Sequence, residues 1–257
     1  MKFQRNLEAK KLNILLRVDL NVPTFNGKVI DDTKIIALKK NLEDLIRKKN
    51  KIFLLSHFGR PKGKINHNFS LKFLSNRIEK TFKLGKVNFL DNCIGSKIKK
   101  KIIAMKYGEI CLLENVRFHE EEENNNIYFS KKLSENFDIY INDAFSTSHR
   151  CHSSIVGVTK FLPSYAGYLF EKEITELENV MKSTCKPTMA IIGGSKVSTK
   201  ISILKNLVKN FDYLIIAGGM ANTFLAAKGY NVGSSNIEKD FFKEVIKIEK
   251  NSLKRSC

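Results

Sequence analysis

Short apolar runs alternate along the chain with longer stretches in which apolar residues recur at helical spacing. The apolar runs span residues 14–18, 52–55, 87–90, 110–113, 139–141, 189–192 and 213–217. Each is rich in Ile, Leu or Val and short enough to be a strand. Because parallel neighbouring strands need a crossover, and helices supply it, this alternation predicts parallel α/β units.

The intervening stretches predict helices over residues 33–48, 70–81, 96–105, 128–136, 172–181, 198–209 and 239–250. The segment 120–126, rich in Glu and Asn, predicts a charged loop instead. We therefore expect an α/β fold, in which a parallel-sheet, Rossmann-like N-terminal domain is joined by a long helix to a partial second α/β domain.

A domain boundary is predicted where a long helical segment, residues 170–181, is followed by a break at Pro187. We expect an N-terminal domain over residues 1–169, a connecting helix and hinge over 170–186, and a partial C-terminal domain over 187–257. The last of these has few elements for a secure core, and residues 251–257 resemble no closing element. We expect the chain to be cut short.

The composition of the 257 residues is that of a globular protein, with 42% hydrophobic and 28% charged residues, and it excludes wholesale disorder. No run approaches the roughly 18 apolar residues of a membrane span, and the first residues lack the apolar core of a signal peptide. We expect a cytoplasmic protein with no membrane partner. The five cysteines never occur as Cys-x-x-Cys, which favours reduced thiols over a disulfide framework or a zinc site.

The formal net charge of +19 raises nucleic acid as a partner. The lysines are dispersed, only eight of the 45 basic residues are arginine, and no basic stripe is interleaved with aromatic residues. We therefore expect anionic small molecules as ligands and no specific nucleic-acid binding, with nonspecific polyanion binding at low salt as a side effect.

Polar residues follow four of the predicted strands, at the strand ends where parallel sheets bind ligands. They are Asp19, Asn21, His57, Arg60, Arg117 and Arg150. Arginine offers a planar fork for carboxylate or phosphate, so this set is what a small phosphorylated acid requires. Each residue has a plain structural alternative, such as a turn cap, a core histidine or a surface charge. It would be a rare coincidence if four converging strand ends all carried such groups by chance.

Two later strands end in paired glycines. The first contributes Gly193, Gly194, Lys196 and Lys200, and the second contributes Gly218 and Gly219. Glycines permit close backbone approach, a helix start offers free N–H groups, and lysines add charge, so the first segment is a candidate phosphate cradle. It is not a Walker A loop, and an ordinary glycine turn remains the alternative. Two such strand ends side by side predict a slot for a nucleotide base.

Seven segments, in family order over nearly the whole chain, resemble those of phosphoglycerate kinases. They are residues 17–23, 56–64 (SHFGRPKGK), 113–118 (LENVRF), 142–152 (NDAFSTSHRCH), 156–163 (VGVTKFLP), 193–200 (GGSKVSTK) and 218–224 (GGMANTF). The resemblance implies the glycolytic phosphoryl transfer between 1,3-bisphosphoglycerate and ADP, giving 3-phosphoglycerate and ATP. It also implies Mg²⁺ bound with the nucleotide, a monomer, and hinge closure about the connecting helix.

The resemblance assigns roles to individual positions. Substrate binding would fall to Asp19, Leu20, Asn21, Lys34, His57, Phe58, Gly59, Arg60, Arg117 and Arg150. Nucleotide binding would fall to Gly193, Gly194, Lys196, Lys200, Gly218 and Gly219. Lys34 and Lys196 would be the catalytic residues that act on the phosphoryl group, and no residue is assigned to a metal.

The sequence departs from the family pattern in two places. Lys34 stands where the family has an arginine in Asp-Asp-Thr-Arg-Ile, and the segments Asn-Gly-Pro-Met-Gly-Val-Phe-Glu and Gly-Gly-Gly-Asp are missing. The sequence therefore leaves two readings open: a phosphoglycerate kinase, or a remnant that binds phosphoglycerate without turnover. A basic nucleic-acid-binding module is a distant third.

Overall fold

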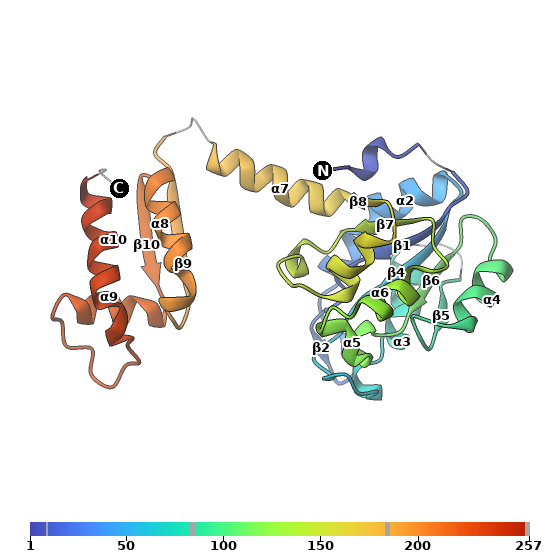
Figure 1. Cartoon of the computed structure of the whole chain (residues 1–257), viewed down its shortest axis with the longest axis horizontal. Helices are drawn as coiled ribbons and strands as arrows, with labels where there is room; N and C mark the ends of the chain where they lie inside the picture. The colour runs from blue at the N-terminus through green and yellow to red at the C-terminus, as the bar shows by residue number, and fades with distance from the viewer. Residues whose placement is uncertain (9, 83–85, 183–185, 255–257) are drawn as a thin grey trace. The chain divides into compact units, whose positions relative to one another are not determined.

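The computed structural model describes residues 1–8, 10–82, 86–182 and 186–254. It divides into two compact units, Met1–Thr175 (unit 1) and Glu176–Cys257 (unit 2), and the division falls within one helix (Figure 1). Residues 183–185 of the predicted hinge, with Cys185, and residues 255–257 of the predicted tail, with Cys257, lie outside the described residues. Cys93, Cys111 and Cys151 are free thiols.

Unit 1 is built on a six-stranded parallel sheet with the order β5-β6-β4-β1-β7-β8. The strands are β1 (Asn13–Arg17), β4 (Lys51–Leu55), β5 (Asn88–Leu90), β6 (Ile110–Leu113), β7 (Ile139–Asn142) and β8 (Ser164–Ala166). The predicted parallel α/β fold is thereby confirmed. The edge strand β8 is absent from the prediction, because its three residues form no apolar run.

Apolar side chains cover both faces of this sheet. In β1, Ile14 and Leu16 point into one core and Leu15 into the other, and Phe53 of β4 packs beside Leu15. All four are completely buried. A strand that is covered on both faces needs no polar alternation, which is why these strands appear in the sequence as continuous apolar runs.

The helices of unit 1 pack in two layers. They are α1 (Thr33–Ile36), α2 (Lys39–Arg47), α3 (Lys72–Phe82), α4 (Ser96–Ala104), α5 (Glu120–Glu123) and α6 (Ile127–Ser134). α1, α2 and α3 contribute to the core that contains Leu16, while α4 and α6 contribute to the core that contains Leu15.

Local structure differs from the prediction in three places. The helix predicted over 33–48 is two helices, although Ala37 and Leu38 between them keep right-handed helical backbone angles. The loop predicted over 120–126 contains α5, whose four consecutive glutamates favour a helix start because they complement its positive end. A short antiparallel hairpin of β2 (Thr24–Phe25) and β3 (Lys28–Val29) was not predicted.

One buried carboxylate ties the loop after β7 to α7 (Tyr168–Met181). Asp143 Oδ1 accepts hydrogen bonds from the amides of Leu169 (2.7 Å) and Phe170 (3.1 Å), and its Oδ2 accepts one from Asn41 Nδ2 (2.7 Å). A side chain at position 167 would collide with this carboxylate, so Gly167 is required there. Burial, opposed by these three hydrogen bonds, raises the pKa of Asp143.

Unit 2 is a pair of parallel strands packed against helices. The strands are β9 (Met189–Gly193) and β10 (Tyr213–Ala217). The helices are α8 (Ile201–Asn210), which connects the two strands, α9 (Gly219–Ala227) and α10 (Phe242–Lys254). Short 3-10 turns, Ser198–Lys200 (η7) and Lys239–Phe241 (η8), precede α8 and α10. The prediction missed α9, because apolar residues surround much of its axis and no single face stands out.

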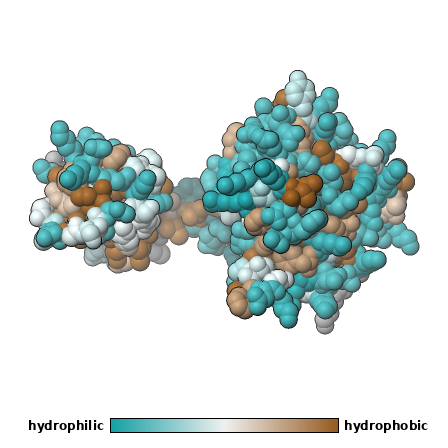
Figure 2. All heavy atoms as spheres, turned by 90° about the horizontal axis from the view of Figure 1, so that it is seen from below, coloured by the Kyte–Doolittle hydropathy of each residue, from teal (hydrophilic) through white to brown (hydrophobic). Residues whose placement is uncertain are grey.

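The sheet of unit 2 is covered on one face. Ile192, Leu214 and Ile216 point towards a core formed by α8, α9 and α10. On the other face Ile191 is 70% exposed and Tyr213 is 54% exposed, and no described element covers them. Hydrophobic residues accordingly reach the surface in this unit as they do in unit 1 (Figure 2). In the described ranges, no helix is long and apolar enough to cross a membrane.

Candidate active site

The carboxyl ends of β1, β4, β6 and β7 bring the predicted basic residues to one edge of the unit 1 sheet. Asp19, two residues beyond β1, is partly buried and accepts hydrogen bonds from three groups. These are the Asn21 amide (3.0 Å), Ser146 Oγ (2.8 Å) and Lys34 Nζ (2.7 Å). Burial acts to raise the pKa of Asp19, but these bonds hold it below its usual value. Lys34 is therefore engaged with Asp19, and it also donates to the Asn21 carbonyl (3.2 Å).

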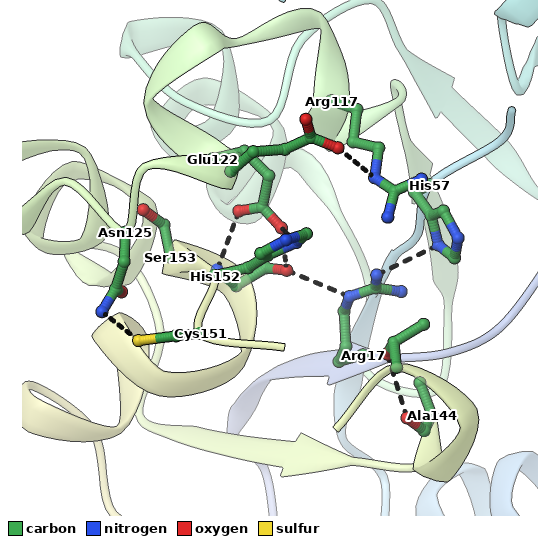
Figure 3. A network of polar contacts seen from close by, with 12 residues as sticks. Arg17, His57, Arg117, Glu122, Asn125, Ala144, Cys151, His152 and Ser153 are labelled. Carbon is green, nitrogen blue, oxygen red and sulfur yellow. Dashed lines mark hydrogen bonds and ion pairs between the residues drawn. The ribbon is translucent and has the colours of Figure 1, made fainter. Parts of the chain in front are cut away.

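His57 lies directly after β4 and is 5% exposed. Its Nδ1 is 3.1 Å from Nη2 of Arg17, the last residue of β1, whose guanidinium is completely enclosed (Figure 3). Burial, with the positive charges of Arg17 and Arg117, lowers the pKa of His57 to about 2. The imidazole is therefore neutral at physiological pH.

Arg117 and Arg150 add two further guanidinium groups. Arg117 lies in η3 (Val116–Phe118) just beyond β6, is 4% exposed, and donates from Nη1 to the Gly59 carbonyl (2.9 Å). Its Nε is 3.2 Å from a Glu123 carboxylate oxygen but is not aligned for a hydrogen bond. Burial lowers the pKa of Arg117, and the charge of Arg150 contributes to the lowering. Arg150 is half-buried, and its enclosed Nε has no hydrogen-bond partner among the described residues.

The loop after His57 requires its glycine. Gly59 has φ +60°, and an added Cβ would lie 2.4 Å from the Phe69 ring, so both the backbone angle and the space favour glycine. Its amide donates to Asn21 Oδ1 (3.0 Å), which joins the loops after β1 and β4. Phe58 is half-buried and packs edge-on against Phe73. Arg60 is exposed and has no ion pair within the described ranges.

Most of the predicted substrate residues thus lie on connected loops, with two qualifications. The Leu20 side chain is completely buried in the core, so only its backbone borders this edge, where its amide donates to Ser56 Oγ (3.0 Å). The side chain of Arg60 makes no hydrogen bond or ion pair with the others in the part of the chain that the structure describes. The analysis of strand ends places Arg17 at the end of the first strand but assigns it no role in the site. It also missed the buried Glu122, which looks in the sequence like one of four exposed glutamates.

In unit 2 the two glycine turns pack directly against each other. The Met220 amide donates to the Gly194 carbonyl (2.8 Å). Gly218 has φ +67°, and a Cβ there would lie 3.1 Å from the Gly194 oxygen. A Cβ at Gly219 would lie 3.3 Å from the backbone of Ser195. Gly193, paired with Ala217, completes the two adjacent strand ends.

The helix start beyond these glycines is less open than the sequence indicates. The amide of Ser198 donates to Glu238 Oε2 (3.0 Å), and the Ser198 hydroxyl donates to Glu238 Oε1 (2.6 Å). At least one amide of this helix start, that of Ser198, is therefore already bonded to a carboxylate from a later loop. Lys196 is exposed, and Lys200 is half-buried with its Cε near Gly194.

The described residues contain no group of three or more His, Cys, Asp or Glu side chains that could hold a metal ion. Mg²⁺ in phosphoryl-transfer sites commonly keeps several waters and is bound by substrate phosphates and one or two carboxylates. The residues present therefore do not form a cage of their own for this ion.

Comparison with known proteins gives one consistent result. A family model described as phosphoglycerate kinase matches residues 4–257. The phosphoglycerate kinase of Bartonella tribocorum is 45% identical over 244 residues, which cover 95% of this chain and 61% of that protein. That of Trichodesmium erythraeum is 47% identical over 237 residues, covering 91% of this chain and 58% of the relative.

Solved structures agree with the sequences. The phosphoglycerate kinase structure from Coxiella burnetii superposes with a TM-score of 0.83 at 35% identity, covering 98% of this chain and 64% of that one. That from Pyrococcus horikoshii gives a TM-score of 0.80 at 29% identity, with the same coverage. The chain spans about three fifths of the length of the relatives it matches.

Proposed function

The chain belongs to the phosphoglycerate kinase family, and on that premise we propose that unit 1 binds 3-phosphoglycerate and that unit 2 binds a nucleotide. The reaction proposed for the protein is the reversible transfer of a phosphoryl group from 1,3-bisphosphoglycerate to ADP, as in glycolysis. In this direction the bond from phosphorus to the carboxyl oxygen breaks. A β-phosphate oxygen of ADP forms the new bond, which leaves 3-phosphoglycerate and ATP.

The observation that carries the proposal is the gathering of positive charge at one sheet edge. Arg117 is buried, the enclosed Nε atoms of Arg117 and Arg150 have no hydrogen-bond partner among the described residues, and both charges lie close enough to His57 to lower its pKa. Burying cations is costly unless they are paired, so a site of this kind favours a multiply charged anion. A glycerate phosphate ester carries both a carboxylate and a phosphate, and each matches a guanidinium fork.

Phosphoryl transfer depends mainly on positioning and on neutralising charge, and the proposed roles follow from that. Arg60, Arg117, Arg150 and His57 would bind the substrate, with Asp19 and Asn21 ordering the loop that faces it. Lys34 and Lys196 would neutralise the charge of the transferring group. The glycine turns around Gly194 and Gly218 would admit the nucleotide closely, with Lys200 beside its phosphates.

The remaining proposals concern cofactor, partners and location. The Mg²⁺ that supplies counter-charge in such reactions would arrive with the nucleotide, since the described residues do not hold it alone. We further propose that the protein works as a cytoplasmic monomer and binds neither membranes nor a specific nucleic acid. The dispersed lysines and the family's small-molecule substrates support this.

Titration calorimetry with 3-phosphoglycerate tests the binding proposal. We expect saturable binding by the 257-residue chain, weakened roughly tenfold or more by Arg60→Ala, because a charge-assisted contact is lost. Arg60 is exposed, so the folded structure should persist. Arg47→Ala is the matched control: it removes the same exposed charge at the far end of α2 and should leave binding unchanged. Absence of binding by the wild-type chain would overturn the proposal.

A second reading, binding of phosphoglycerate without turnover, is favoured by two contacts. Lys34 is held by Asp19, and Glu238 accepts the hydrogen bond of the Ser198 amide, at the helix start predicted as a phosphate cradle. A coupled assay of ATP formation decides between the readings. ATP formed by the 257-residue chain excludes the second, whereas 3-phosphoglycerate binding with no ATP excludes the first for this chain.

A further inference from the structure

We propose that Glu122, Ser154 and Arg17 form a buried relay that holds His57 as the neutral tautomer with its proton on Nε2. The relay thereby determines what His57 offers to the ligand of unit 1: a hydrogen-bond donor, never an acceptor or a cation. That the ligand is phosphoglycerate rests on the proposed function. The tautomer assigned to His57 in the free protein is independent of that proposed function.

The assignment begins at the contact between Arg17 and His57. Nη2 of Arg17 lies 3.1 Å from Nδ1 of His57, with both groups buried. A guanidinium has donors and no acceptor, so Nδ1 must present its lone pair. A neutral imidazole with a lone pair on Nδ1 carries its single proton on Nε2. Arg17 therefore selects the tautomer of His57.

Arg17 can do this because its guanidinium is fixed on its other sides. Nη1 donates to the carbonyls of Val18 (2.5 Å) and Leu55 (3.5 Å), at the ends of β1 and β4. Nε donates to Ser154 Oγ (3.1 Å), in the helical turn Ser153–Gly157 (η5). With these contacts made, little freedom remains to rotate Nη2 away from the histidine.

Glu122 orients the hydroxyl on which Arg17 depends. Ser154 Oγ donates to Glu122 Oε1 (2.5 Å), and the Ser154 amide donates to Glu122 Oε2 (2.8 Å). Because the hydroxyl hydrogen points to the carboxylate, a lone pair of Oγ is left for Arg17 Nε. His152 Nδ1 lies 3.6 Å from Oε1 of the same carboxylate (Figure 3).

Glu122 is suited to this role because it is both buried and charged. The Glu122 side chain is completely buried. Burial acts to raise the pKa of Glu122, but the contact with His152, the charge of Arg17 and the two bonds from Ser154 together hold it below its usual value. The carboxylate therefore compensates the buried charge of Arg17 through the intervening hydroxyl, without contacting the ligand edge itself.

The charged groups around His57 support a neutral ring. Arg17 of β1, Arg117 of η3 and Arg150 after β7 disfavour protonation, whereas Asp19, after β1, favours it. Burial of the imidazole ring acts in the same direction as the three arginines and disfavours its protonation. A neutral Nε2–H donor that does not change between pH 5 and 8 would keep ligand recognition independent of pH over that range.

Nitrogen-15 NMR of the full chain labelled at histidine tests the relay without any ligand. The His57 signals are assigned by comparison with His57→Gln. We expect the pattern of an Nε2–H tautomer with no titration between pH 5 and 8. A proton on Nδ1, or a titration midpoint inside that range, would overturn the inference, and both are read from the spectra of the wild-type chain.

Ser154→Ala breaks the relay at its centre, and Ser153→Ala is the matched control. Ser153 is the buried neighbour on the same turn, but its hydroxyl donates to the carbonyls of Glu121 and Asn126 and touches neither Arg17 nor Glu122. We expect Ser154→Ala to mix the His57 tautomers and to weaken 3-phosphoglycerate binding about tenfold. Ser153→Ala should change neither.

The outcomes separate the two proposals. Identical His57 spectra in the two serine variants would show that the hydroxyl does not set the tautomer, and would sink the relay even if the ligand binds. A wild-type chain with the expected spectrum but no affinity for 3-phosphoglycerate would leave the relay standing and reject the proposed function.

Discussion

Lys34 places a single ammonium group against Asp19 and the Asn21 carbonyl, at a position where an arginine would offer a fork. With a guanidinium, one nitrogen could keep the Asp19 contact while another reached the phosphoryl group. We predict that Lys34→Arg raises kcat roughly tenfold, less than the effect of removing a whole preorganised donor.

The measurement is the steady-state rate of ATP formation. Lys39→Arg makes the same chemical change on the surface of α2, where Lys39 is 3.8 Å from Glu43, and should leave kcat unchanged. An equal or lower kcat in Lys34→Arg would remove position 34 from the catalytic set.

At the scale of single residues, the sequence shows which residue types follow the strands, but not which side chains they contact in the folded protein. Arg117 and Arg150 were predictable, because an arginine just beyond a strand end has few structural reasons to be there. Glu122 and Ser154 were not, because burial of a charged or hydroxyl side chain depends on packing between α5 and η5, segments about 30 residues apart. No local pattern distinguishes Glu122 from its exposed neighbours.

At the scale of secondary-structure elements, a substitution at Gly218 tests whether the two glycine turns of unit 2 need their close packing. Alanine at this position would be strained by the left-handed backbone conformation. Its Cβ would also lie too close to the backbone of Gly194. Gly233→Ala is the control, since it has φ +58° and nothing within 4 Å of the added Cβ.

We predict that Gly218→Ala lowers the free energy of unfolding by about 1–2 kcal/mol more than Gly233→Ala does, because only the former is overpacked. Urea unfolding followed by far-UV circular dichroism measures both. Equal losses in the two variants would mean that the turns can separate without cost.

The two strands of unit 2 are joined at their starts by Asp212. Its carboxylate accepts hydrogen bonds from the Thr188 amide (2.6 Å) and hydroxyl (2.8 Å), with Lys186 beside it. These bonds, led by the Thr188 amide, lower the pKa of Asp212 from 3.8 to about 2.

Because the folded-state pKa is depressed, the stabilisation from Asp212 is present above about pH 4 and is lost as the pH falls towards 2. We predict that Asp212→Asn shows a smaller loss of stability between pH 4 and 2 than the wild type in urea unfolding. A carboxyl titration of Asp212 by NMR with a midpoint near 3.8 would contradict this prediction.

Element types were largely predictable, and element boundaries less so. Strands β1, β4 and β6 were recognisable because burial on both faces makes them uninterrupted apolar runs. β8 is too short to produce such a run, and α9 lacks a polar face, so neither has a periodic pattern. The division between units falls within α7, whose sequence continues without a break.

For the molecule as a whole, the two units differ in how their sheets are covered. Unit 1 has cores on both faces, whereas the described core of unit 2 lies on one face and centres on Leu204, Val208 and Met220. A unit with a smaller core has a lower free energy of local unfolding.

We predict that backbone amides of β9 and β10 exchange with deuterium faster than those of β1 and β4. Hydrogen exchange followed by mass spectrometry on the 257-residue chain, at neutral pH and without ligand, makes the comparison. Equal protection of the two sheets would show that the exposed face of unit 2 does not limit its stability.

The fold class could be predicted from the sequence because alternating strand and helix patterns permit few arrangements. The charge of the whole chain was less informative. A value of +19 describes lysines spread over the surface, while the proposed binding site depends on a few arginines gathered at one edge of the unit 1 sheet.

The position of Asp143 also has a mechanical consequence. The carboxylate that holds the first turn of α7 belongs to the same loop that carries Arg150, so the loop and the helix share one point of attachment. A displacement of that loop on ligand arrival would be passed to the base of α7 through two hydrogen bonds, with no other side chain in between. The three groups that donate to Asp143 are an amide side chain and two backbone amides, so we expect salt to weaken this attachment less than it would weaken an ion pair.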